Sequence, residues 1–189
     1  MNNNNNNNNE MEIATLANGC FWCTEAIFKK LKGVKSILPG YAGGTVKNPS
    51  YNQVCTGSTG HAESIQIKFD PTVISFEKIL DIFWHTHDPT TLNRQGNDIG
   101  TQYRSAIFYH DEKQKEIAEK SKKDLEEEHV YKDAIVTEIS PFKNFYVAED
   151  YHKDYYENHK DNAYCNFTID PKLDKLLQKY RNEVKEEYK

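Results

Sequence analysis

The chain has 189 residues and a formal net charge of −5, from 24 basic and 29 acidic residues. This length suits one domain that buries roughly 70% of the surface its unfolded chain exposes, so a core can form without disulfides. The acidic balance argues against nucleic-acid binding, and no apolar run is long enough to span a membrane. Four cysteines without a recognisable signal peptide predict a reducing, cytoplasmic location.

The first ten residues differ from the rest, because Asn2 to Asn9 form an uninterrupted polar tract. Such a tract can bury no apolar surface, so we predict a disordered tail over residues 1–10. A role in assembly is the alternative, but the tract is short for it. Residues 11–189 show no internal repeat, long linker or abrupt change in composition, which indicates a single domain.

The hydrophobic pattern predicts short strands and helices that follow one another along this domain. The predicted strands are residues 12–17, 34–38, 64–69, 104–109 and 134–139. The predicted helices are residues 21–31, 76–85, 111–129 and 171–188. The glycine-rich segment 39–44 is expected to be a loop. Mixed elements in this order indicate an α+β or α/β sandwich.

The pentad Gly19-Cys20-Phe21-Trp22-Cys23 lies between the first predicted strand and the first predicted helix. The free N–H groups at a helix N-terminus lower the pKa of a nearby thiol, so we predict that Cys20 is a nucleophilic thiolate. Phe21 and Trp22 are expected to wall an apolar pocket beside its sulfur. Cys23 follows about one helical turn later and shares that face of the helix.

Proton donors are expected near such a nucleophile, since a leaving oxygen must be protonated. Glu63 lies at the entrance to the predicted strand 64–69, where apolar neighbours would raise its pKa and suit it to act as a general acid. A solvated loop carboxylate is the alternative. Tyr51, Asp98 and Tyr103 lie in other polar turns, and phenols can donate hydrogen bonds from an apolar body.

Several short motifs, in order along residues 13–180, resemble peptide methionine sulfoxide reductases of the A type. They are residues 19–22, 48–51, 60–63, 87–90, 100–105, 148–152 and 164–165. The resemblance implies a compact two-layer α+β sandwich of the ferredoxin-like kind, with helices packed on a mixed sheet and the active site in an open basin. It also implies protein repair by reduction of the S epimer of methionine sulfoxide, free or in proteins.

The family's active-site residues fall on seven positions of this chain. They are the nucleophile Cys20, the general acid Glu63, the oxygen-binding tyrosines Tyr51 and Tyr103, the carboxylate Asp98, and the aromatic walls Phe21 and Trp22. Attack by the thiolate would release methionine and leave a sulfenic acid, which a second thiol converts to a disulfide. The family implies thioredoxin as the reductant, and we expect a monomer. No glycine-rich phosphate loop is present, so no cofactor is expected.

Two thiols compete for the resolving role. Cys165 follows Tyr164 in a segment that resembles the family's mobile resolving region. Cys23 stands where the family more usually has glycine, and it completes a Cys-x-x-Cys pair with Cys20. We expect Cys165 to act first, with Cys23 as a second or alternative thiol. Cys55 is expected to be a small buried apolar residue.

Two other functions use the same cysteines. A thioredoxin-like dithiol exchange protein would need only Cys20 and Cys23, and it would leave the carboxylate and tyrosine motifs unused. A zinc module would combine these cysteines with His85 and His87, or with His61. The chain has no second Cys-x-x-Cys and no His-x₃₋₅-His to complete a known zinc pattern, so we expect structural histidines and no metal.

Overall fold

A six-stranded mixed sheet forms the centre of the computed structural model, which describes residues 10–189. Its strands are β1 (Glu12–Asn18), β2 (Val34–Ala42), β3 (Ala62–Phe69), β6 (Ser105–Tyr109), β7 (Glu138–Pro141) and β8 (Phe145–Val147). The strand order is β7-β6-β1-β3-β2-β8, and only β6 and β7 run parallel. Apart from Glu10, the predicted tail lies outside the described residues.

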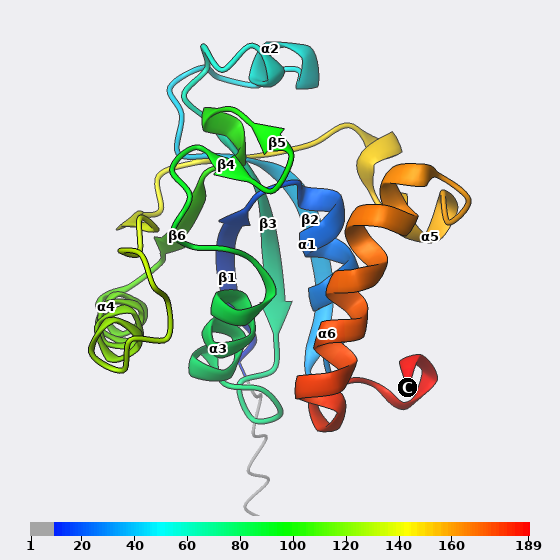
Figure 1. Cartoon of the computed structure of the whole chain (residues 1–189). Coiled ribbons are helices and arrows are strands. Elements are labelled where there is room, and N and C mark those ends of the chain that lie inside the picture. Colours follow the sequence, from blue (N-terminus) through cyan, green and yellow to red (C-terminus); the bar gives the residue numbers. More distant parts are fainter. Residues whose placement is uncertain (1–9) are drawn as a thin grey trace, which may run out of the picture.

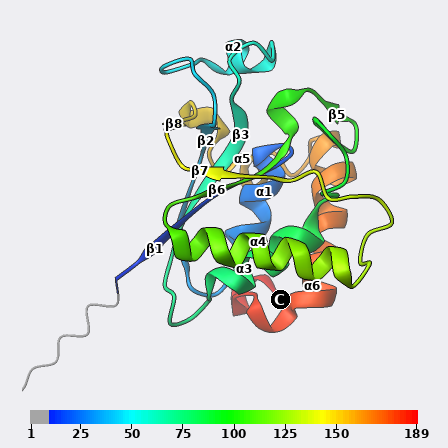
Figure 2. The same cartoon turned by 90° about the vertical axis from the view of Figure 1, so that its left-hand side faces the viewer.

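The helices that carry most of the packing lie on one face of this sheet, as Figures 1 and 2 show. They are α1 (Phe21–Phe28), α3 (Phe76–Thr86), α4 (Glu112–Glu127) and α6 (Asp170–Tyr180). Side chains alternate between the faces of a strand, so Leu16, Ile65 and Ile107 all point into this layer and are fully buried. The predicted two-layer α+β fold is therefore confirmed.

The opposite face of the sheet carries a smaller apolar cluster. Four alanines on neighbouring strands, Ala17, Ala42, Ala62 and Ala106, are fully buried there with Phe108. The segment after β7 covers them with partly buried aromatic side chains. Because the alanine side chains on this face are small, a short segment is enough to cover them, and the large helices pack on the other face.

Shorter elements lie at the end of the sheet where β1 ends and β3 begins. They are α2 (Tyr51–Cys55), β4 (Arg94–Gln95), β5 (Asp98–Ile99) and the 3₁₀ turn Thr101–Tyr103. In Figure 1 they occupy the top of the molecule. α5 (Tyr155–Asn158) and the π-helical turn Cys165–Ile169 lie beside α1 and lead into α6.

Several predicted boundaries are wrong because tertiary pairing decides them. Segment 39–44 is not simply a loop: β2 continues to Ala42, since β3 on one side and β8 on the other supply ladder hydrogen bonds. The predicted strand 134–139 begins only at Glu138, where pairing with β6 starts. The first helix ends at Phe28 and the last at Tyr180, and Leu31 and Val184 beyond them form a β-bridge.

Candidate active site

Cys20 sits at the junction between β1 and α1. Gly19 makes the turn with φ = +96°, in the left-handed region, and a Cβ atom there would lie 2.7 Å from the side chain of Gln95. Cys20 then becomes the N-cap residue of α1, and its carbonyl accepts a hydrogen bond from the Thr24 hydroxyl at 3.2 Å. Only 5% of Cys20 is exposed, so the turn directs its thiol inward.

The two thiols of the pentad have opposite pKa shifts. Burial raises the pKa of the Cys20 thiol, and its hydrogen bond with Cys23 and the charge of Glu63 act in the same direction. The hydrogen bond with Cys20 lowers the pKa of Cys23 to about 7, although burial opposes this. A lowered pKa was predicted for Cys20, but in this structure its pKa is raised, and burial is the largest cause.

Glu63 lies beside Cys20 because their strands are paired. β1 and β3 run antiparallel with Leu16 opposite Ile65, which brings the end of β1 to the start of β3. Glu63 is the second residue of β3, not a residue that precedes the strand as predicted. Its Oε2 accepts the backbone N–H of Phe21 at 3.1 Å, so the carboxyl faces the first turn of α1.

The environment of Glu63 favours its protonated form. The residue is 2% exposed, and burial raises the pKa of the carboxyl to about 8, with the charge of Asp98 adding to the shift and the Phe21 amide opposing it. At neutral pH Glu63 therefore holds a proton next to Cys20. The raised pKa expected from the sequence is confirmed.

Two phenols complete the polar side of the site. A capping box between Ser50 and Gln53 starts α2 at Tyr51, and Tyr103 ends the 3₁₀ turn Thr101–Tyr103. Both tyrosines are half-buried. Burial raises the pKa of each hydroxyl, and the charge of Glu63 adds to both shifts. The two hydroxyls therefore stay protonated and can act as hydrogen-bond donors.

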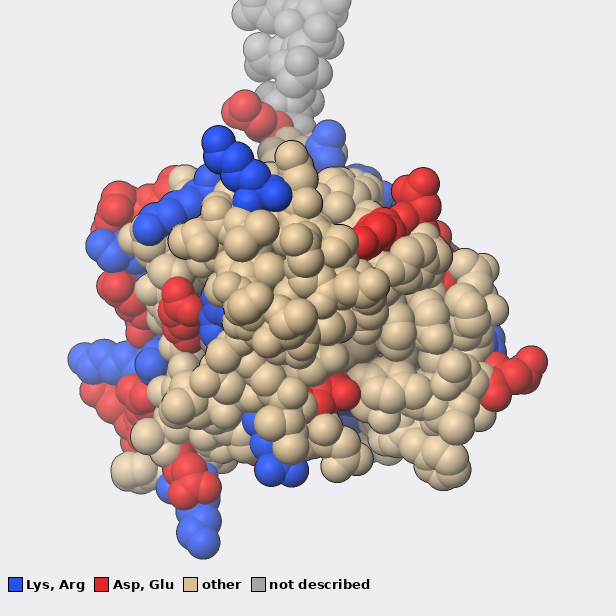
Figure 3. Space-filling view, turned by 90° about the horizontal axis from the view of Figure 1, so that it is seen from above, with Lys and Arg blue, Asp and Glu red and all other residues tan. Residues whose placement is uncertain are grey.

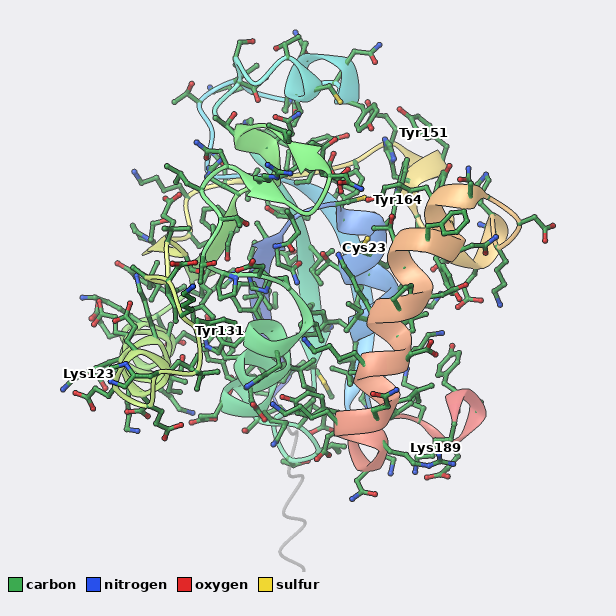
Figure 4. The ribbon with its side chains drawn as sticks, viewed as in Figure 1. Cys23, Lys123, Tyr131, Tyr151, Tyr164 and Lys189 are labelled. Carbon is green, nitrogen blue, oxygen red and sulfur yellow. The ribbon has the colours of Figure 1, made fainter. Side chains whose placement is uncertain are left out.

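Asp98 contacts a residue to which the sequence assigned no role. The Tyr164 hydroxyl donates a hydrogen bond to Asp98 Oδ2 at 2.8 Å and lies 3.7 Å from Cys23 Sγ. Figure 4 shows Cys23 and Tyr164 next to each other between α1 and the C-terminal part of the chain. The position of Tyr164 directly before Cys165 was the only sequence signal for it.

The aromatic walls have a second layer of support. Phe21 is buried and Trp22 is half-exposed. The Trp22 ring stacks on Tyr155 at 3.6 Å between centroids, and its Nε1–H donates to His152 Nδ1 at 3.0 Å. Glu149, in the same stretch of chain, accepts the backbone N–H of Tyr51 at 2.8 Å. The motif 148–152 pointed to this stretch, but sequence reasoning gave its side chains no role.

The remaining two cysteines lie in different environments. Cys165 begins the π-helical turn and is completely buried, and burial raises the pKa of its thiol. Cys55 is exposed, so the prediction that it is buried is wrong. Neighbouring residues of a helix point about 100° apart, and in α2 it is Val54 that faces the core. Burial raises the pKa of the Cys55 thiol, and the nearby Tyr51 hydroxyl opposes this shift.

The histidines proposed for a zinc module have other contacts. The two ring nitrogens of His87 lie 2.7 Å from the Phe83 carbonyl and 2.8 Å from Ser105 Oγ, and burial lowers its pKa to about 3. Both ring nitrogens of His61 contact backbone atoms. In residues 10–189, no three histidine, cysteine or acidic side chains are grouped as metal ligands would be.

The surface over this end of the molecule is mostly uncharged. Figure 3 looks onto that face and shows few charged side chains near its centre, with lysine, arginine and acidic side chains gathered at the margin. A cavity of about 300 Å³ opens beside Asp98 and Tyr164. Along residues 10–189, no helix has both the length and the apolar composition needed to cross a membrane.

Comparison with known proteins identifies the family. The family model for peptide methionine sulfoxide reductase matches residues 12–185. The peptide methionine sulfoxide reductase MsrA of Saccharolobus solfataricus is 56% identical over 175 residues, which cover 93% of this chain and 98% of the relative. MsrA of Sulfolobus acidocaldarius is 57% identical over 170 residues, which cover 90% of this chain and 96% of the relative.

Solved structures agree with the sequence relatives. Mxr1 from Saccharomyces cerevisiae in reduced form is 37% identical, with a TM-score of 0.77 over 82% of this chain and 90% of that chain. Methionine sulfoxide reductase A of Corynebacterium diphtheriae is 35% identical, with a TM-score of 0.71 over 79% of this chain and 76% of that chain. The chain therefore belongs to the A-type peptide methionine sulfoxide reductase family.

Proposed function

We propose that this protein reduces the S epimer of methionine sulfoxide, free or within polypeptides, through a sulfenic acid at Cys20. The observation that supports this most directly is the buried, protonated Glu63 beside the Cys20 thiol, together with two phenols that face the same carboxyl. An acid next to a sulfur nucleophile is what removal of a sulfoxide oxygen requires.

The reaction transfers one oxygen atom between two sulfurs. The Cys20 sulfur attacks the sulfoxide sulfur while Glu63 protonates the sulfoxide oxygen, and Tyr51 and Tyr103 stabilise that oxygen with hydrogen bonds. The oxygen ends on Cys20 as a hydroxyl group, and methionine leaves with its sulfur reduced by two electrons. Cys20 is oxidised by the same two electrons, and the proton from its thiol restores Glu63.

Selection of one epimer follows from the two-sided site. Phe21 and Trp22 offer an apolar wall for the substrate methyl group, whereas Glu63 and the phenols require the oxygen on the other side. Only one arrangement of groups around the chiral sulfur meets both conditions with the peptide directed outward. The A-type family points to the S epimer.

Resolution of the sulfenic acid uses Cys23 and Cys165. The sequence-based order put Cys165 first, and both thiols are buried. Interaction with Cys20 lowers the pKa of Cys23 to about 7, however, whereas burial raises the pKa of Cys165. These contacts support the reverse order. In our proposal Cys23 displaces water from the Cys20 sulfenic acid, and Cys165 then attacks Cys23 and moves the disulfide out of the pentad.

The proposed reductant of that disulfide is thioredoxin. Mxr1 from Saccharomyces cerevisiae, 28% identical with a TM-score of 0.56 over 79% of this chain and 87% of that chain, has been solved in complex with Trx2. Cys20, Cys23 and Cys165 are all buried in this structure, so a disulfide at residue 165 would become reachable for such a partner only when the segment around Cys165 moves. The monomeric state and the cytoplasmic location stay predictions.

The test is turnover of resolved S and R sulfoxides with dithiothreitol as reductant. We expect the wild type to consume the S epimer, and Cys20→Ser to release no methionine. As a control, Cys55→Ser also removes one thiol and should keep the activity. Equal activity of Cys20→Ser and the wild type would reject the nucleophile, and exclusive use of the R epimer would reject the stereochemistry.

A further inference from the structure

The segment that carries Cys165 begins at one turn beside α1. We call residues 155–169 the C-terminal arm; it begins with α5, ends with the π-helical turn, and follows Asp154. Asp154 has φ = +55°, a left-handed conformation that is uncommon for residues other than glycine and must be held by its surroundings. The contacts of Asp154 therefore determine the direction in which the arm leaves the turn.

Two side chains of the first helical segment hold this turn. Glu25 Oε2 accepts the backbone N–H of Asp154 at 2.9 Å, and Lys29 forms an ion pair with the Asp154 carboxylate. Only 3% of Glu25 is exposed. Glu25 lies two residues after Cys23 in α1. One helix thus carries a reactive thiol and also the group that holds the base of the arm.

The other contacts of the arm lie beyond the turn. Tyr155 stacks on Trp22, Glu157 pairs with Lys30 at 3.2 Å, and the Tyr156 hydroxyl donates to Asp170 at 2.7 Å. Each fixes one point along the arm. Nearer to Cys165, the Tyr164 hydroxyl donates to Asp98 at 2.8 Å. The turn sets where the arm starts, so a rotation there would change the path of the chain between these contacts and with it the approach of Cys165.

We propose that Glu25 is a positioning residue for the resolution step, because it fixes the Asp154 turn and thereby the approach of Cys165 to the thiols of α1. The inference rests on the proposed resolving role of Cys165. In that step the Cys165 thiolate bonds to the Cys23 sulfur, the Cys20–Cys23 bond breaks, and Cys20 leaves as a thiolate that takes up a proton. One disulfide replaces another, so no oxidant is needed.

The ionisation of Glu25 provides a way to examine this role. Burial raises the pKa of its carboxyl to about 7, although the hydrogen bond from Asp154 opposes the shift. The carboxyl lines a cavity of about 300 Å³ with charged groups from α1, β2, the turn and the chain end. These groups are Lys29, Lys35, Lys153, Asp154 and Lys185. A carboxylate accepts an N–H more strongly than a neutral acid, so its hold on Asp154 strengthens above pH 7.

The experiment follows Cys165 directly after one equivalent of methionine sulfoxide is added to the full-length enzyme without reductant. Methionine release reports the first step, and alkylation followed by mass spectrometry reports how fast Cys165 enters any disulfide. In Glu25→Ala we expect methionine release within about twofold of the wild type, and entry of Cys165 slowed on the order of tenfold, from loss of a hydrogen bond to a charged acceptor.

The conservative variant Glu25→Gln adds a second measurement, the pH dependence of disulfide formation at Cys165. Loosened packing alone would not change this pH dependence. Glu25→Gln keeps an oxygen that accepts the Asp154 N–H but cannot ionise. The rate at which Cys165 enters a disulfide should match the wild type at pH 6, where Glu25 is mostly neutral, and fall below it at pH 8 and above. This comparison remains decisive if Glu25→Ala does not fold.

Two control variants separate the turn from the rest of the arm. Glu157→Ala removes the ion pair with Lys30 and should slow Cys165 much less than Glu25→Ala. Asp154→Gly keeps the N–H that Glu25 accepts and adopts positive φ freely, but it loses the ion pair with Lys29, so Cys165 should be slowed less than in Glu25→Ala. Folded Glu25→Ala with wild-type Cys165 kinetics, or Glu25→Gln equal to the wild type at every pH, would overturn the proposal. A wild type that releases no methionine would instead reject the proposed function.

Discussion

Cys20 and Glu63 are placed by paired strands at the centre of the sheet, whereas Tyr155 and Cys165 are placed by side-chain contacts between the C-terminal arm and α1. Glu63 is paired with Tyr41 in the ladder between β2 and β3, and Cys20 follows the end of β1, whose last residues pair with β6. Moving either residue would therefore disturb backbone hydrogen bonds of the sheet. The arm is joined to its neighbours one side chain at a time.

This difference matches the two halves of the proposed reaction. Oxygen transfer needs the acid and the nucleophile at fixed separation, since small displacements of reacting groups are costly to rate. Disulfide exchange needs Cys165 to leave a completely buried position. We call Cys20 and Glu63 with their strands the rigid region; it would perform the oxygen transfer. The C-terminal arm, which is held by individual contacts, would supply the thiol that moves in disulfide exchange.

The largest expected effect comes from removing both resolving thiols. The Cys23→Ser and Cys165→Ser double variant should release one methionine per enzyme in a single turnover and then stop, because thioredoxin finds no disulfide to reduce. Methionine release with and without thioredoxin measures this. Continued thioredoxin-driven turnover by the double variant would show that the arm is not needed for resolution.

The next effect tests the rigid region alone. Glu63→Gln removes the proton donor but keeps a side chain of the same size, so the rate of methionine release should fall by about 10²–10⁴-fold. Exchange of a preformed disulfide with thioredoxin should be unaffected, since it uses the arm. Rapid-quench measurement of methionine gives the first rate, and reduction of the oxidised enzyme gives the second. An equal loss of the two rates would mean that the rigid region and the C-terminal arm do not act independently.

The sequence predicted the rigid region better than the arm. Cys20 follows a recognisable strand and turn, and Glu63 starts an alternating apolar run, so local patterns place both. Glu25 and Asp154 are 129 residues apart, and no local pattern in either segment shows that they meet. Val54 and Cys55 illustrate the same limit, because a five-residue helix has too short an apolar pattern to show which residue faces inward.

A smaller effect follows from the pKa of Glu63. The proton donor is lost as pH rises through about 8, so the ratio of wild-type to Glu63→Gln methionine release should fall about tenfold between pH 7 and pH 9. Cys20 ionises in both proteins, so its contribution to the pH dependence largely cancels in the ratio of the two rates. A ratio that stays constant over this range would show that Glu63 does not supply the proton.

The same carboxyl should affect stability. The folded pKa of Glu63 lies above the ordinary value, so the folded protein keeps a proton that the unfolded chain releases, and the free energy of unfolding should fall as pH rises toward about 8. Denaturant titrations at several pH values measure this slope. The slope should be smaller in Glu63→Gln, and an equal slope in both proteins would place the titrating group elsewhere.

The smallest effect concerns the thiol that belongs to neither region. Cys55 is exposed while Cys20, Cys23 and Cys165 are buried, so a brief pulse of maleimide on the folded enzyme should label Cys55 well before the others. Cys55→Ser keeps a hydroxyl that can hydrogen-bond Tyr51, and its stability should change by no more than about 0.5 kcal/mol. Peptide mapping after the pulse identifies the labelled thiol. Early labelling of Cys165 would instead mean that the arm opens on its own, and that its contacts with α1 hold it less firmly than the structure indicates.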